Sequence, residues 1–180
     1  MMKFISLIVL FVCASLADNT IHKMTDKQLH VLQTVRDVAK NIPDKNGKTY
    51  ENTVSAICIT ESSAGKNTIG DFHHKKSITK ASLGAMQVRV STARHVSESV
   101  KSLNWLNRLS DIQLAARLLG DTRLSAKVAT YYVVLLHNQR KNSFNAVSGY
   151  NGGMVNHTYY NKVMKNKAIV AQLVSSGKLS

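Results

Sequence analysis

Residues 53–67 read "TVSAICITESSAGKN", an apolar run that leads directly into the acidic residue Glu61. Apolar side chains recur in it at helical spacing, at Val54, Ile57 and Cys58, and predict a helix. Glu61 follows Cys58 by three positions and Ile57 by four, so its side chain lies on the same helix face as the apolar stripe. We therefore expect the carboxylate to point inward or into a cleft.

Helical spacing continues along the rest of the chain, while the alternation typical of strands is almost absent. Thr25 and Ser110 each begin a capping box, a pattern that marks a helix start. Pro43 and Gly120 mark helix ends. The sequence predicts a compact all-α domain, with helices over about residues 25–42, 50–60, 85–97, 110–120, 123–139, 144–148 and 158–174 and a long loop over 62–81.

The first 17 residues, "MMKFISLIVLFVCASLA", have the pattern of a secretory signal peptide. Lys3 precedes an apolar core, and a small-x-small cleavage site ends at Ala17. The apolar run is too short to span a bilayer comfortably, so we expect cleavage and no membrane span afterwards. A lipid-modified Cys13 is the second interpretation. Residues 18–180 would then form a single domain.

The chain is strongly basic, with 24 Lys and Arg against 10 Asp and Glu. Its net charge of +14 becomes +13 when Lys3 leaves with the signal peptide. Such a charge indicates a polyanionic partner: nucleic acid, an anionic membrane surface or the bacterial cell wall. The densest basic runs, residues 73–76 and 162–167, are not interleaved with stacking aromatics. Together with export, this argues against nucleic acid.

Cys58 is the one cysteine left after signal cleavage, so the mature chain can form no internal disulfide. That suits a bacterial periplasmic protein better than a disulfide-rich secreted one. The place of Cys58 in the apolar stripe predicts an inert buried thiol. The histidines lack the spacing of a helical zinc site, and no G-x-S-x-G motif is present. We expect neither a metal nor an organic cofactor.

Three further motifs follow Glu61: "SLGAMQV" at residues 82–88, "SGYNGG" at 148–153 and "TYYNKVMK" at 158–165. In order and content, Glu61 and these motifs resemble the lytic transglycosylases of the soluble, goose-lysozyme-like superfamily. The resemblance covers about residues 54–165, and it implies a lysozyme-like helical fold that acts on the glycan strands of peptidoglycan.

The resemblance also implies roles for individual residues. Glu61 would be the single catalytic acid and base. The positions that would line the sugar cleft or contact the glycan are Met86, Gln87, Tyr150, Asn151 and one of Tyr159 and Tyr160.

The chemistry suits a single glutamic acid in an apolar pocket. Protonating a glycosidic oxygen near neutral pH requires a raised pKa, and apolar surroundings such as Val54, Ile57 and Met86 raise it by disfavouring the ionised form. Ordinary glycosidases use two carboxylates, and the nearest other acid in the sequence is Asp71. In the family that the chain resembles, the N-acetyl group of N-acetylmuramic acid assists the leaving sugar. The 6-hydroxyl then loses its proton to the glutamate and closes onto C1 as a 1,6-anhydro ring.

The chain departs from that family at Gly70, where many relatives have a serine nine residues after the glutamate. The insertion-like "DFHHKK" at residues 71–76 also lengthens this segment. Ser82 is the candidate for the missing polar role. For Glu61 itself, the alternative to catalysis is a salt bridge with a nearby Lys or Arg.

We expect a periplasmic peptidoglycan lytic transglycosylase that opens the wall locally for a secretion or appendage machine, with glycan strands as its substrate. Two other functions stay open. A lysozyme-type hydrolase of the same fold would use Asp71 as a second acid, and a non-catalytic wall-binding or assembly protein would keep only the fold.

Overall fold

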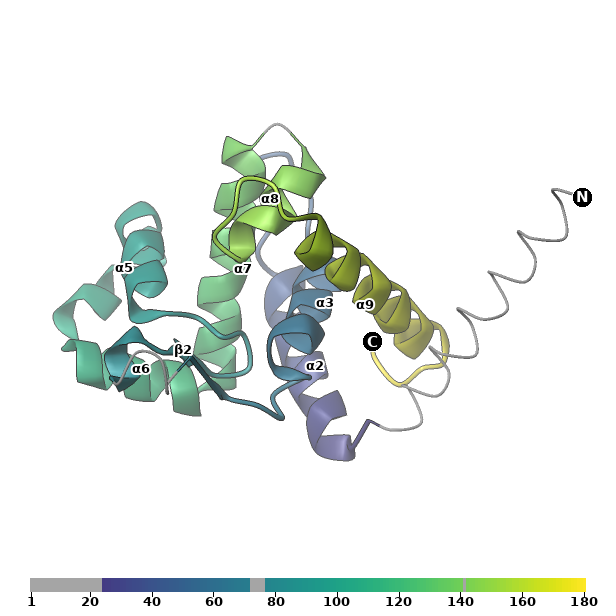
Figure 1. Ribbon diagram of the computed structural model, residues 1–180, viewed down its shortest axis with the longest axis horizontal. Coiled ribbons are helices and arrows are strands. Elements are labelled where there is room, and N and C mark those ends of the chain that lie inside the picture. The colour runs from purple at the N-terminus through teal and green to yellow at the C-terminus, as the bar shows by residue number, and fades with distance from the viewer. Residues whose placement is uncertain (1–23, 72–76, 141) are drawn as a thin grey trace, which may run out of the picture.

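The computed structural model describes residues 24–71, 77–140 and 142–180. These residues form a mainly helical structure, which confirms the predicted fold class (Figure 1). The expected signal peptide, Cys13 and the basic run at residues 73–76 lie outside the described residues.

The helices and strands follow one another along the chain with short connections. In order they are α2 (Asp26–Lys40), α3 (Glu51–Ser62), β1 (Ile69–Gly70), the 3₁₀ helix η1 (Ile78–Lys80), β2 (Ser82–Leu83), α5 (Val90–Ser99), the 3₁₀ helix η2 (Lys101–Arg108), α6 (Asp111–Gly120), α7 (Thr122–Gln139), α8 (Ser143–Tyr150) and α9 (His157–Ser175). Thr25 and Ser110 both complete capping boxes, as predicted. In Figure 1, α2, α3 and α9 lie on one side of α7, and α5 and α6 lie on the other.

Helix α3 is the centre of the core. It packs against α2, α7 and α9, and its side chains from Thr53 to Cys58 are buried. A helix that is enclosed on several faces is apolar almost all round, which is why its apolar residues extend beyond a single stripe. On α9 the facing core residues include Val170 and Leu173, both fully buried. This packing fixes where the carboxyl end of α3, and therefore Glu61, is held.

Helix α3 ends in a left-handed turn. Ser63 and Ala64 have φ values of 52° and 57°, a conformation that cannot continue a right-handed helix. The buried hydroxyl of Ser62 donates a hydrogen bond of 2.6 Å to the carbonyl of Ala85 and accepts one of 2.7 Å from the amide of Gly65. The end of α3 is thereby tied to the "GAMQ" segment.

The structure differs from the sequence-based prediction around residues 62–97. The predicted helix over 85–97 begins only at Val90, because Gly84 and Gln87 have left-handed φ values of 72° and 49° and form a tight turn. The predicted loop over 62–81 contains β1, which pairs antiparallel with β2 and places Gly70 opposite Ser82. Two-residue strands are too short to leave an alternating pattern in the sequence.

The sequence pattern also did not predict the 3₁₀ helix η2. Leu103 and Leu106 are its two buried residues, and their spacing of three matches the 3₁₀ period.

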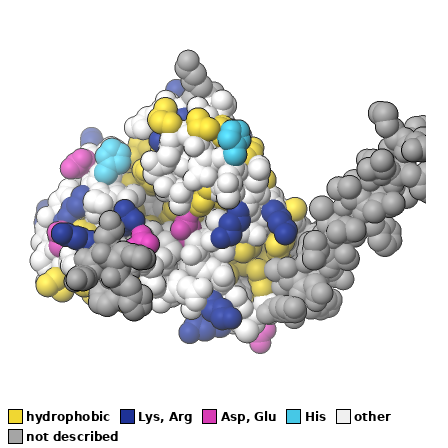
Figure 2. All heavy atoms as spheres, viewed as in Figure 1, with side chains coloured by type: hydrophobic (Ala, Val, Ile, Leu, Met, Phe, Trp, Pro, Cys, Tyr) yellow, Lys and Arg dark blue, Asp and Glu magenta, His cyan; other side chains and the backbone are white. Residues whose placement is uncertain are grey.

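In Figure 2, Lys and Arg side chains are scattered over the described part of the face, without one dominant patch. None of the helices within residues 24–71, 77–140 and 142–180 has the length and apolar character that a membrane crossing needs.

Candidate active site

An open cavity of about 390 Å³ lies at the carboxyl end of α3, and we call it the Glu61 cavity. Parts of the chain far apart in sequence meet there: the ends of α3 and α8, the β1–β2 pair, the turn before α5, and α5 and α7. The lining residues are Glu61, Asp71, Ser82, Gln87, Arg89, Thr92, Tyr132, Tyr150, Asn151 and Gly152.

Glu61 stands in the last turn of α3, partly buried, with its carboxylate held by a tyrosine. The hydroxyl of Tyr159 donates a hydrogen bond of 2.6 Å to Oε1 of Glu61. Tyr159 lies in the first turn of α9, where the side chain of Asn156 caps the helix by accepting the Tyr159 amide at 2.9 Å. The packing of α9 on α3 therefore sets the position of this hydrogen bond.

Burial raises the pKa of Glu61, because the ionised carboxylate loses hydration there. The hydrogen bond from Tyr159 and the positive charge of Lys162 act in the opposite direction, and the negative charge of Asp71 raises the pKa further. The net shift is upward, so Glu61 keeps its proton to a higher pH than an exposed glutamate would. Within the described residues Glu61 forms no ion pair.

Two tyrosines form the wall of the cavity above the "GAMQ" turn. Tyr150 donates a hydrogen bond of 2.8 Å from its hydroxyl to the carbonyl of Met86, and its ring centroid lies 5.7 Å from that of Tyr132.

The "GYNGG" motif also brings backbone close to a neighbour, as its glycines predict. A Cβ added at Gly149 would lie 2.7 Å from Cζ of Arg140.

The wall formed by the β1–β2 pair and the residue before α5 carries charge. Arg89, the residue before α5, donates from Nη2 to Oδ2 of Asp71 at 2.7 Å and from Nε to Oγ of Ser82 at 3.3 Å. Because β1 pairs with β2, Asp71 directly follows the strand that lies beside Ser82. Asp71 adopts a left-handed φ of 58°, which only a minority of non-glycine residues do.

The space beside Gly70 is filled by the side chain of Gln87. A Cβ at position 70 would lie 2.2 Å from Oε1 of Gln87. The Gln87 amide nitrogen donates to the carbonyls of Gly84 at 3.0 Å and Asn67 at 3.3 Å, which holds the side chain there. A side-chain amide therefore fills the space that a side chain at position 70 would enter.

Most of the residues expected from the sequence come together here. Glu61, Ser82, Gln87, Tyr150 and Asn151 line the Glu61 cavity, and Tyr159 contacts Glu61 directly.

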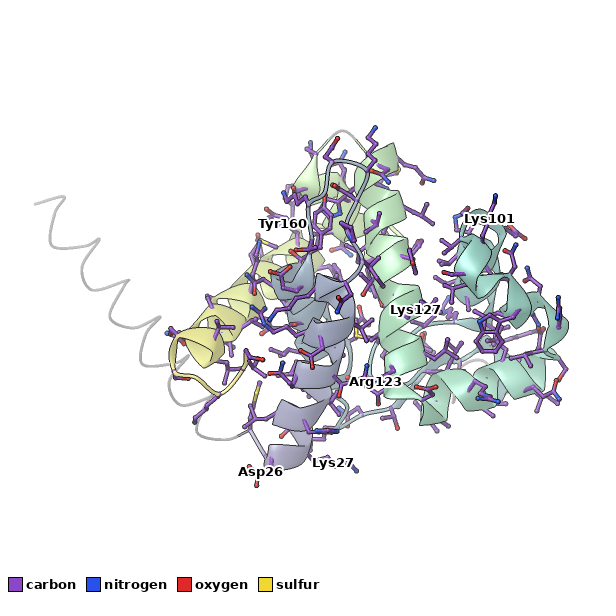
Figure 3. All side chains as sticks on the ribbon, turned by 180° about the vertical axis from the view of Figure 1, so that it is seen from behind. Asp26, Lys27, Lys101, Arg123, Lys127 and Tyr160 are labelled. Atoms are coloured by element: carbon purple, nitrogen blue, oxygen red, sulfur yellow. The ribbon has the colours of Figure 1, made fainter. Side chains whose placement is uncertain are left out.

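Met86, an expected cleft residue, and Tyr160, the alternative to Tyr159, are placed elsewhere. The Met86 side chain is fully buried beneath the cavity, and only its carbonyl takes part, as the acceptor for Tyr150. Tyr160 packs with its ring centroid 5.0 Å from that of Phe144 and lines a separate cavity of about 440 Å³ with residues such as Lys48 (Figure 3). Neighbouring residues on a helix point about 100° apart, so Tyr159 and Tyr160 cannot both face Glu61.

Three lining residues, besides Gly152 of the "SGYNGG" motif, were not expected from the sequence: Arg89, Thr92 and Tyr132. Arg89 and Thr92 follow the "GAMQV" motif closely, but nothing in their spacing relates them to Glu61. Tyr132 lies in the predicted helix over 123–139, and its neighbour in space, Tyr150, is 18 residues away in the sequence.

The sequence matches a model of a known protein family. The family model described as "Transglycosylase SLT domain" matches residues 40–172, which include Glu61 and all the cavity-lining residues. Searches of curated proteins and of solved structures give no match. The chain therefore belongs to the transglycosylase SLT domain family, a membership that supports a lytic-transglycosylase-type function on peptidoglycan.

Proposed function

We propose that the protein is a peptidoglycan lytic transglycosylase that cleaves the β-1,4 bond between N-acetylmuramic acid and N-acetylglucosamine. Its product would be a 1,6-anhydro-N-acetylmuramic acid end. One observation carries the proposal: in a chain of this family, a glutamic acid whose pKa is raised by burial faces an open cavity and accepts a hydrogen bond from Tyr159.

The first step uses the protonated form of Glu61. The carboxylic acid donates its proton to the glycosidic oxygen, while the N-acetyl group of the muramic acid displaces the leaving sugar at C1. Burial supports this step by keeping Glu61 protonated at a pH where an exposed glutamate is ionised.

The second step uses the ionised form that the first step leaves behind. The Glu61 carboxylate takes the proton of the 6-hydroxyl, and the resulting oxygen attacks C1. This attack breaks the bond between C1 and the N-acetyl oxygen that formed in the first step, restores the N-acetyl group and closes the anhydro ring. The short hydrogen bond from Tyr159 stabilises the carboxylate between the steps. Because the nucleophile belongs to the same sugar, its proximity favours ring closure over attack by water.

A lysozyme-type hydrolase is the second candidate, because Asp71 lines the same cavity as Glu61. In that mechanism Asp71 would activate a water molecule. Its Oδ2 accepts the 2.7 Å bond from Arg89, which orients the carboxylate. The two candidates differ in their products: a reducing end for hydrolysis and an anhydro end for transglycosylation.

The decisive experiment is mass spectrometry of the fragments released from purified peptidoglycan. We expect wild-type protein to release anhydro-muropeptides, and Glu61→Gln to lower the rate by about 10³-fold, since one side chain serves as both acid and base. Glu51→Gln is the matched control, because Glu51 lies on the same helix but lines the separate cavity that includes Tyr160.

Each alternative has its own outcome. Reducing ends in the products would favour the hydrolase. Glycan release that is equally fast with Glu61→Gln would contradict the role of Glu61. Binding to the wall without any release would favour a wall-binding assembly protein.

The proposal includes export to the periplasm by the signal peptide over residues 1–17 and local opening of the wall for a secretion or appendage machine. The net charge of +13 after cleavage would draw the protein to the anionic wall, and this part of the affinity should weaken as salt is added.

A further inference from the structure

Arg89 lies where two cavities adjoin. It lines the Glu61 cavity and also a larger one of about 620 Å³, whose other lining residues include Lys80, Arg94 and Asp111. A glycan strand bound at Glu61 and continuing into the larger cavity would therefore pass its guanidinium. The Arg89 side chain is 45% exposed, so a ligand can reach it.

Hydrogen bonds to two side chains hold the guanidinium of Arg89 in place. Its bonds to Asp71 and Ser82 fix two directions of the planar group and use only part of its N–H donors. Asp71 is itself 46% exposed, and an ion pair this accessible to water contributes little net free energy. Arg89 can therefore accept a second anionic partner while Asp71 keeps it oriented.

The charges around the Glu61 cavity make Arg89 selective. Among the described residues that line the cavity it is the one basic side chain, whereas Glu61 and Asp71 are both acidic. A ligand carboxylate in this cavity would be repelled by ionised Asp71 unless it reached the guanidinium. Arginine is well suited to that contact, because its planar fork matches the two oxygens of a carboxylate.

We propose that Arg89 is a specificity-determining residue that binds a carboxylate of the muramyl unit next to the cleavage site. This inference rests on the proposed function for the identity of the glycan. Two sources offer that carboxylate: the lactyl group of a muramic acid that has lost its stem peptide, and the stem peptide itself. Ser82 and Gln87, which line the same cavity, carry no charge, so the contact depends on Arg89.

The test compares strands that differ only in that charge. Strands stripped of stem peptides by an amidase carry free lactyl carboxylates, and coupling them to methylamine turns the same groups into neutral amides. Intact strands, with peptide carboxylates free or coupled in the same way, form the second pair. Binding is measured by calorimetry on Glu61→Gln, so that no substrate is consumed, and KM and kcat are measured on the wild type.

We expect the strand with the free carboxylate to bind about tenfold more tightly than its neutral partner, with the difference in KM rather than in kcat. Adding Arg89→Gln should abolish this preference, and adding Arg89→Lys should keep part of it. Arg123→Gln is the matched control: this exposed arginine at the start of α7 (Figure 3) lines a different cavity. If the thermal unfolding temperatures of the Arg89 and Arg123 variants equal that of the protein without these substitutions, folding is intact.

The source of the bound carboxylate follows from which pair of strands shows tighter binding of the form with the free carboxylate. A preference in the stripped pair assigns the lactyl carboxylate, and one confined to the intact pair assigns the stem peptide. Equal affinity within both pairs, or a preference that survives Arg89→Gln, would overturn the proposal. If wild type cleaves no strand while the preference in binding is present, the proposed reaction fails and the carboxylate site stands.

Discussion

The two sides of the Glu61 cavity are built in different ways. The helical side, Glu61 and Tyr159, comes from the packed helices α3 and α9, and its hydrogen bond of 2.6 Å is partly buried. The strand side, Asp71, Ser82 and Arg89, comes from two-residue strands and the start of α5, and its ion pair is about half exposed. Packing fixes the helical side, whereas exposed polar contacts fix the strand side. We therefore expect changes on the helical side to affect stability, rate and pH response most strongly, and changes on the strand side to affect substrate preference, with a smaller effect on pH response.

The largest contrast should appear in stability. Leu173 on α9 is fully buried in the core, and Leu173→Ala should lower the free energy of unfolding by about 3 kcal/mol, because it leaves a cavity. Arg89→Gln should change it by less than about 1 kcal/mol, because the Arg89 side chain is half exposed. Urea denaturation measures both values. Similar losses in the two variants would contradict the difference between the two sides.

A smaller effect is expected from the tyrosine on the helical side. Tyr159→Phe removes the hydrogen bond that favours ionised Glu61, so the pKa of Glu61 should rise further. Glu61 then stays protonated to higher pH, so the alkaline limb of the pH–rate profile should move to higher pH. We also expect a loss of rate of about tenfold, because the ionised carboxylate of the second step loses a charge-assisted bond. An unchanged profile would show that Tyr159 does not tune Glu61.

The smallest effect is expected from the acid on the strand side, and it has the opposite sign. Asp71→Asn removes a negative charge that raises the pKa of Glu61, so the alkaline limb should move to lower pH. The shift should be smaller than that of Tyr159→Phe and should shrink with added salt, because solvent screens an exposed charge. A shift in the same direction as that of Tyr159→Phe would contradict this assignment.

The same contrast explains what the sequence could predict. The helical side follows from local spacing: the apolar stripe of α3 predicts that Glu61 faces inward, and it does. Spacing could not choose between Tyr159 and Tyr160, since that choice depends on how α9 packs on α3. The strand side has no local signal, because Asp71 and Arg89 meet across 18 residues through a pair of very short strands.

Met86 shows a further limit of the sequence pattern. Its motif belongs to the site, but the left-handed turn at Gly84 and Gln87 directs the Met86 side chain into the core and leaves the backbone carbonyl to act. A motif identifies the segment that forms a site without telling which atoms of each residue face the ligand.

The close approach of Gln87 to Gly70 has a consequence for how this cavity can evolve. A serine at position 70 would force the Gln87 side chain to give up its bonds to the Gly84 and Asn67 carbonyls, so the effects of changes at positions 70 and 87 are not additive. Because the clashing atom is the far end of a flexible side chain, Gly70→Ser should have a modest cost beside Gln87 and a smaller one after Gln87→Ala. The order of substitutions therefore matters, and the easier path to a serine at position 70 passes through position 87.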